Sequence, residues 1–329
     1  MRFLHVANGG CTTSIIRAAG IPGLRSLWAD PLYEGPVPGG LTDEELLEVR
    51  ERFLGGPDEA SEAEHENSLR TWRANIERHE RYDELILWFE HDLFDQLGLI
   101  QVLTWIRGRV PPAKAVSLIC IGSFPGRPAF KGLGELMPDE LASLVDTRRP
   151  VSDEQFALAA RAWTAFRAAD PQELDGLWRS DLQPLPFLSA ALRRFLEEYP
   201  WTRDGLSRSE RRLLELADPG PIALMDAFPR MQEGEDAYYI TDGSILELVE
   251  TLSRTSPALL TFDPDPVGSS AGPVLHGAMA ITNAGRDVFA GRLDRIAACG
   301  LDRWYGGVHL HDNGPMWRWD DQSERIRKA

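Results

Sequence analysis

The chain has 329 residues, and its 43% hydrophobic and 26% charged residues are typical of a folded globular protein rather than a disordered one. This length exceeds the usual size of one domain, roughly 100–200 residues, and therefore favours two domains. The net charge is −16, with 51 acidic against 35 basic residues, so the whole-molecule field repels polyanions and argues against non-specific nucleic-acid binding.

The sequence gives no sign of export or of a membrane span. Its first ten residues lack the basic and long apolar regions of a signal peptide, and no apolar run approaches the ~18–20 residues of a spanning helix. The three cysteines, Cys11, Cys120 and Cys299, have none of the close spacing found in zinc or redox motifs. We therefore expect a cytoplasmic protein with free thiols and no membrane partner.

The first part of the chain alternates short apolar runs with helical patterns. Residues 3–7 predict a strand, which passes through Asn8-Gly9-Gly10 into a helix over residues 12–19. A second strand over residues 24–29 ends at Asp30, and Thr42 with Glu45 forms a capping box for the next helix.

A charged helical stretch over residues 59–81 precedes the third apolar run, residues 85–89, and a helix over residues 93–106. The fourth strand, residues 115–121, ends at a Gly-Ser turn. Four strands that alternate with helices predict a mostly parallel, Rossmann-like sheet in an α/β domain over residues 1–134.

The rest of the chain predicts two further parts. Residues 135–200 are helical and broken by prolines, and we expect a helical extension of the first domain. Residues 201–329 predict a helix that begins at residues 206–210, further helices over 222–228 and 242–255, a strand pair over 258–262 and 278–281, and a helix from Thr282. This order indicates a winged-helix-like α+β domain, which ends in a hairpin within residues 304–320.

Six short motifs stand out along the chain: VANG at residues 6–9, WADP at 28–31, EGP at 34–36, WFEHDLFDQ at 88–96, GGVHL at 306–310 and WRWD at 317–320. With these motifs the chain resembles an uncharacterised bacterial family of unknown function over nearly its whole length. The resemblance implies no activity, because none is established for that family.

Polar residues follow each strand of the predicted sheet. Because ligands bind beyond the carboxyl ends of parallel strands, we expect these residues to line one pocket for a small anionic ligand. The glycines and threonines at the first helix can present N–H groups to a phosphate, or instead they only permit a tight turn and cap the helix. The expected ligand-binding residues are Asn8, Gly9, Gly10, Thr12, Thr13, Asp30, Glu34 and Ser123.

The densest group of ionisable residues is Glu90, His91, Asp92 and Asp95, which lie between the third strand and the first turn of the following helix. These four are our predicted catalytic residues, serving as general acid and base or as ligands of a divalent metal ion. The alternative is structural, since acids are favoured in a first helical turn and Asp92 can be its N-cap.

Two histidines of the tail, His309 and His311, alternate on a predicted strand and so face the same side. With His91 and Asp92 they complete our set of potential metal ligands, although an aromatic hairpin that packs both rings explains the pair more simply. No third ligand follows them at a typical spacing.

Two classes of function remain open. In the first, the protein is an enzyme, a hydrolase or transferase, that acts on a small anionic, phosphorylated or nucleotide-like molecule. In the second, it is a ligand-sensing regulator with a DNA-binding winged helix, or a binding protein without catalysis. Residues 201–294 contain 8 arginines, no lysine and 15 acidic residues. We therefore expect no nucleic-acid partner, and we expect the winged helix to serve packing or homodimer formation.

Overall fold

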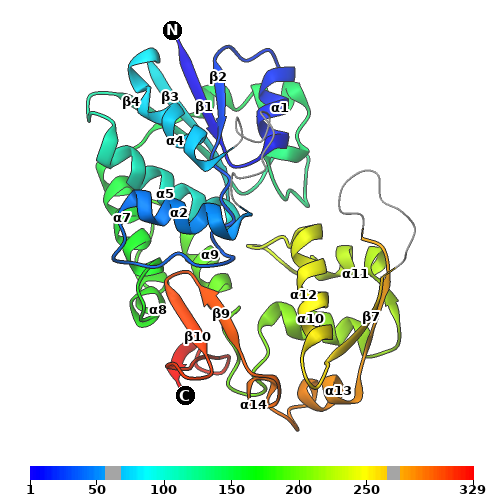
Figure 1. Ribbon diagram of the computed structural model, residues 1–329. Helices are drawn as coiled ribbons and strands as arrows, with labels where there is room; N and C mark the ends of the chain where they lie inside the picture. Colours follow the sequence, from blue (N-terminus) through cyan, green and yellow to red (C-terminus); the bar gives the residue numbers. More distant parts are fainter. Residues whose placement is uncertain (56–67, 265–274) are drawn as a thin grey trace. The chain divides into compact units, whose positions relative to one another are not determined.

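The computed structural model describes residues 1–55, 68–264 and 275–329 (Figure 1). These residues form two compact units. The first unit comprises residues 1–192 with 304–309, and the second comprises residues 193–303 with 310–329. Each unit is described by itself.

The first unit is built on a five-stranded sheet in the order β2-β1-β3-β4-β5. The first four strands are parallel, and the short β5 runs antiparallel to β4. The expected mostly parallel sheet is therefore confirmed. The strands are β1 (Phe3–Ala7), β2 (Leu24–Leu27), β3 (Glu84–Glu90), β4 (Ala115–Ile121) and β5 (Arg149–Pro150).

Helices connect the strands and continue after β4. α2 begins with the expected capping box of Thr42 and Glu45. In the charged stretch 59–81, only α4 and η1 are helical within the described residues, and residues 59–67 lie outside them. The helices are α1 (Gly10–Ala18), α2 (Asp43–Phe53), α4 (Leu69–Glu77), η1 (His79–Arg81), α5 (Leu93–Arg109), η2 (Leu133–Glu135), α6 (Pro138–Ala142), η3 (Val145–Thr147), α7 (Asp153–Phe166), α8 (Gln172–Trp178) and α9 (Leu188–Leu196), whose last turn belongs to the second unit.

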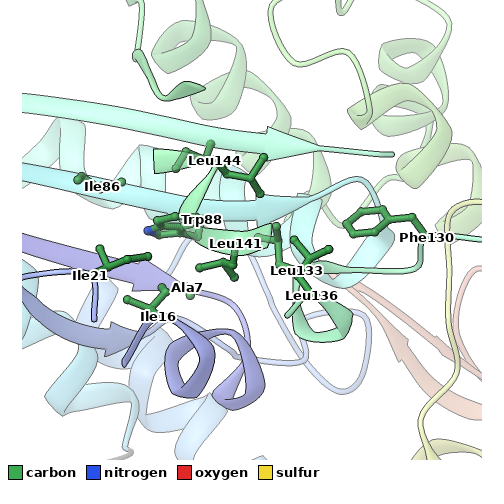
Figure 2. Packing of buried hydrophobic residues seen from close by; sticks show 11 residues of the cluster. Ala7, Ile16, Ile21, Ile86, Trp88, Phe130, Leu133, Leu136, Leu141 and Leu144 are labelled. Atoms are coloured by element: carbon green, nitrogen blue, oxygen red, sulfur yellow. The ribbon is translucent and has the colours of Figure 1, made fainter. Parts of the chain in front are cut away.

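β3 is the centre of the hydrophobic core. Its side chains alternate between the two faces of the sheet, and Leu85 to Phe89 are all buried. Figure 2 shows Ile86 and Trp88 packed with Ile16 of α1 and Leu141 of α6 on one face. α5 packs against α7 and contacts β3, and it is buried on nearly all sides because it is apolar all round. Each fully buried Leu or Ile contributes roughly 1.5–3 kcal/mol to stability.

The second unit has the expected three helices, strand pair and final helix. An additional strand, β6, precedes α11, because Ile222 and Ala223 pair with β8 instead of starting the predicted helix. The antiparallel sheet has the order β6-β8-β7. The elements are α10 (Arg208–Ala217), β6 (Ile222–Ala223), α11 (Leu224–Met231), α12 (Asp242–Arg254), β7 (Leu260–Asp263), β8 (Ala278–Ile281), α13 (Asn283–Phe289) and α14 (Arg295–Cys299).

The tail forms two small sheets where the sequence predicted one hairpin. β9 (Asp302–Tyr305) pairs with β10 (Val308–His311), and β11 (Trp317–Asp320) pairs antiparallel with β12 (Arg325–Lys328). Each strand pairs with its nearer neighbour in the sequence, so the tail contains two strand pairs instead of one.

Within the described residues, every helix is too short or too polar to cross a lipid bilayer.

Candidate functional site

The candidate site lies where the carboxyl ends of β1 and β3 meet. The chain leaves β1 to form β2 on one side, and β3 and β4 follow on the other side, so the strand order reverses between β1 and β3. In open α/β sheets such a reversal separates the connecting loops and leaves a crevice for ligands. Asn8 follows β1 directly, and its Nδ2 donates to Oδ2 of Asp95 at 2.9 Å. The residues that follow β1 and β3 therefore lie together, as expected.

Three carboxyl groups gather beside Asn8, and we call Glu90, Asp92 and Asp95 the acid cluster. Each offers a carboxylate oxygen, and these oxygens lie within 4.8 Å of one another. Glu90 ends β3, Asp92 is the N-cap of α5, and Asp95 lies in the first turn of that helix. The sequence WFEHDLFDQ folds this way because its buried strand stops at the first charged residue and Asp92 can cap the helix.

Backbone N–H groups hold all three carboxyl groups in place. The N–H of Glu90 donates to Asp95 Oδ1 at 2.8 Å, and the N–H of Asp95 donates to Asp92 Oδ1 at 2.9 Å. The N–H of Leu133, more than 40 residues further along the chain, donates to Glu90 Oε1 at 2.5 Å. The acid cluster is therefore rigidly positioned, and the N-cap role proposed as the structural alternative for Asp92 is real.

Burial raises the pKa of every acid in the cluster. Desolvation, followed by the charge of Asp92, raises the pKa of Glu90 to about 8, although the bond from Leu133 opposes the shift. Desolvation also raises the pKa of Asp92 to about 6, and it raises the pKa of Asp95 well above its usual value. Near neutral pH the cluster therefore retains protons unless a cation balances its charge.

The cluster suits a hard divalent cation. Carboxylate oxygens are the ligands that Mg²⁺ and Ca²⁺ prefer, and Glu90, Asp92 and Asp95 supply three from one edge. A further oxygen lies beside them, since Asn8 Oδ1 is buried and accepts no hydrogen bond within the described part of the chain. The same carboxyl groups, when protonated, can act as general acids.

His91 belongs to a different environment from its three neighbours. Its ring is stacked on Phe130 at 6.3 Å and meets Phe187 edge-on at 6.1 Å between ring centroids. The described residues contain one group of three potential metal ligands, and this group does not include His91.

The N-terminus of α1 faces this edge without a side-chain cap. Its N-cap is Gly9, which has no side chain, and the helix begins at Gly10. Thr12 is buried, and the Thr13 hydroxyl donates to the carbonyl of Gly10 at 2.9 Å. Neither threonine caps the helix, contrary to the structural alternative in the sequence analysis, because both lie inside it.

The structure places the other predicted ligand-binding residues outside the acid cluster. Asp30 is buried in an ion pair with Arg50, whose Nη2 lies 2.6 Å from Asp30 Oδ1. The same guanidinium donates from Nη1 to the carbonyl of Glu34 at 2.7 Å. This pair fixes the loop after β2 against α2. Ser123 is exposed in the turn after β4.

The two tail histidines lie on β10, and both occupy its half-buried face, as their spacing predicted. The ring of His309 stacks on Trp304 at 4.5 Å with an interplanar angle of 5°. Neither histidine joins a group of three potential metal ligands in the described residues.

Sequence reasoning missed two parts of the site. Gly132 and Leu133 close over Glu90, and Cys120 of β4 lies next to Gln96, whose Nε2 is 3.5 Å from the sulfur. Burial raises the pKa of the Cys120 thiol to about 12, so this thiol is not a nucleophile. No sequence signal marks residues 132 and 133, because only the fold brings them to β3.

In the comparisons with known proteins, no family model and no curated protein matches the chain.

Proposed function

We propose that the first unit is an enzyme that acts on a small anionic, phosphorylated molecule by acid–base or divalent-cation-assisted hydrolysis or transfer. The observation that carries this proposal is the acid cluster at the reversal point of the sheet, with three carboxyl groups of raised pKa held by backbone bonds. A stability role alone would not require three mutually repelling acids at one strand end.

The uncapped N-terminus of α1 supports the choice of an anionic substrate. Free N–H groups at a helix N-terminus bind phosphate, and Gly9 lets the substrate approach closely. A phosphate beside ionised carboxylates would be repelled, so the acids must either keep their protons or share a cation with the substrate. In the second case the cation would be held by Glu90, Asp92 and Asp95 and would supply charge stabilisation.

Titration of the protein with Mg²⁺ and Mn²⁺ by calorimetry tests the cation site, and phosphate release from a panel of nucleotides and phosphomonoesters tests the activity. We expect Asp92→Asn to weaken cation binding or turnover by about tenfold or more, and Asn preserves the helix cap.

We expect His91→Ala to fold normally and to lower substrate binding or turnover, by about tenfold if His91 transfers a proton.

Asp146→Asn is the matched control, because Asp146 is fully exposed and lies outside the cluster. If cation binding and turnover are the same in Asp92→Asn, Asp146→Asn and the unmodified protein, the acid cluster is structural and the proposal is wrong.

The alternative function is that of a ligand-sensing regulator, and one observation favours it. The second unit has the order helix, strand, two helices and two strands, which we interpret as a winged helix. However, α12, the helix in the position of a DNA reader, exposes Asp242 and Glu247. A helix that reads the major groove presents Arg, Lys, Asn or Gln. We therefore propose that this unit serves packing or homodimer formation.

A further inference from the structure

A hollow of about 360 Å³ lies beside the edge strand β2. One face of α1 lines it with Gly10, Ser14 and Arg17, which follow the spacing of one helix face. Arg25 of β2 and Trp72 of α4 also line the hollow. None of the nine lining residues is acidic, and none belongs to the acid cluster.

Arg17 and Arg25 are the distinctive residues of this hollow. Both are exposed, and within the described residues neither has a carboxylate partner. Arg25 only donates to the nearby carbonyl of Gly23, at 3.4 Å. Arg50 of the same unit, by contrast, is bound by a carboxylate and by carbonyl groups. Two guanidinium groups that no carboxylate of the described residues compensates form a local positive site in a protein with a net charge of −16.

The other polar groups of the walls are largely used by the protein itself. The Thr13 hydroxyl donates to the carbonyl of Gly10, and Asn75 Nδ2 donates to Ser26 Oγ at 3.1 Å. These bonds occupy Thr13 and Asn75, whereas Arg17 and Arg25 keep guanidinium donors that bond to no other group in the described part of the chain. Arg17 lies in the last turn of α1, where the helix dipole favours a cation. That effect does not account for Arg25, which lies on a strand.

We propose that this hollow binds a phosphate-bearing small molecule through Arg17 and Arg25. A guanidinium group matches the geometry of phosphate oxygens and can donate two hydrogen bonds to them. The volume lies at the lower end of the range for small-molecule pockets, about 300–1,000 Å³, which suits a ligand of nucleotide size or smaller. The hollow and the acid cluster share no residue, although Gly10 at the start of α1 lines the hollow and also belongs to the helix N-terminus of the proposed substrate site.

Calorimetric titration with inorganic phosphate and with AMP, at constant ionic strength, tests the proposal. The variants are Arg17→Gln, Arg25→Gln and the double variant. We expect the double variant to bind both probes at least about tenfold more weakly, and each single variant to show a smaller loss, because each removes charge-assisted hydrogen bonds. The control is Arg161→Gln, an exposed arginine of α7 that does not line the hollow, and it should bind as the unmodified protein does.

Three results would overturn the proposal. They are unchanged binding in the double variant, an equal loss in Arg161→Gln, and no binding by the unmodified protein at about 10 mM of either probe. The arginine variants separate this inference from the proposed function, because neither arginine belongs to the acid cluster, so they should lose phosphate affinity while keeping Mg²⁺ affinity within about twofold. If Glu90→Gln abolishes phosphate binding and the arginine variants do not, the phosphate binds at the acid cluster, and the inference fails while the proposed function stands. Thermal melts check that each variant is folded.

Discussion

Each acid of the cluster accepts at least one backbone hydrogen bond, and each nevertheless has a raised pKa. Hydrogen bonds to a carboxylate favour its charged form, whereas burial and neighbouring acids oppose it. At these positions burial is the largest effect. The cluster is therefore a place where the folded protein holds protons, and its charge depends on the pH and on any cation that binds.

The pH dependence of stability should show this directly. The pKa of Glu90 is 4.5 in an unperturbed chain and about 8 in the folded protein. The folded state therefore binds more protons than the unfolded state between these pH values. The contribution of Glu90 to stability is present below about pH 4.5 and is lost as the pH rises through about 8. We expect Glu90→Gln to be more stable than the unmodified protein at pH 8, by about 1–2 kcal/mol. We also expect the free energy of unfolding of this variant to fall less between pH 4.5 and 8.

Denaturant unfolding of both proteins at several pH values between 4.5 and 9 measures this effect. Glu140→Gln is the control of opposite sign, because the hydrogen bond from Arg127 holds the pKa of Glu140 below its usual value. Parallel stability curves for Glu90→Gln and the unmodified protein would show that Glu90 is ionised in the folded state.

The sequence predicts Asp30 as a ligand-binding residue, whereas the structure pairs it with Arg50. Its carboxylate accepts hydrogen bonds from Nε and Nη2 of Arg50, and both side chains are almost fully buried. Removing one charge of a buried pair leaves the other uncompensated, which costs about 3–5 kcal/mol. We expect Asp30→Asn to lower the free energy of unfolding by this amount without changing ligand binding in the folded protein. Denaturant titration and calorimetry measure the two effects separately, and a loss of ligand affinity at full folding would restore Asp30 to the site.

Among the elements, the start of η2 is hydrogen-bonded to the end of β3. Leu133 bonds to Glu90, and its side chain belongs to the core around Trp88 (Figure 2). Gly132 is required there, because a Cβ atom would clash with the carboxylate of Glu90. Its backbone is extended, so the requirement is one of space and not of backbone conformation.

We expect Gly132→Ala to destabilise the protein by about 1–3 kcal/mol, since it overpacks a closed contact, and to change the cation affinity of the acid cluster. The matched control is Gly108→Ala in α5, where a Cβ atom meets nothing within 4 Å. That change should be neutral or stabilising by up to about 1 kcal/mol, because Ala favours a helix over Gly. Thermal melts and Mg²⁺ titration compare the two variants, and equal behaviour would mean that Gly132 does not position Glu90.

At the scale of the whole molecule, charge argues against DNA as a partner. The net charge is −16, and α12 exposes the acids Asp242 and Glu247. We expect no sub-micromolar binding to duplex DNA at low salt, because too few phosphates could be neutralised. Fluorescence anisotropy with duplexes of mixed sequence measures this, and a tight, salt-sensitive affinity would favour the regulator over the enzyme.

The alternation of strands and helices and the acids at the end of β3 could be predicted from the amino-acid sequence alone. Periodicity and capping are local properties, so the capping box of Thr42 and Glu45 and the cap at Asp92 could be predicted from neighbouring residues. Local reasoning also led to errors, such as the helix expected at Ile222, where pairing with a distant strand prevails.

Which strand ends share a site depends on how the folded chain orders its strands. The order β2-β1-β3-β4 joins Asn8 to Asp95, while the buried Arg50 takes Asp30 into an ion pair. The contact of Leu133 with Glu90 likewise joins residues that are far apart in the sequence, as does the hollow, which α4 lines together with α1 and β2. The physical reason is that burial and pairing set the charge and the role of each carboxyl group, and both depend on neighbours that only the folded chain supplies.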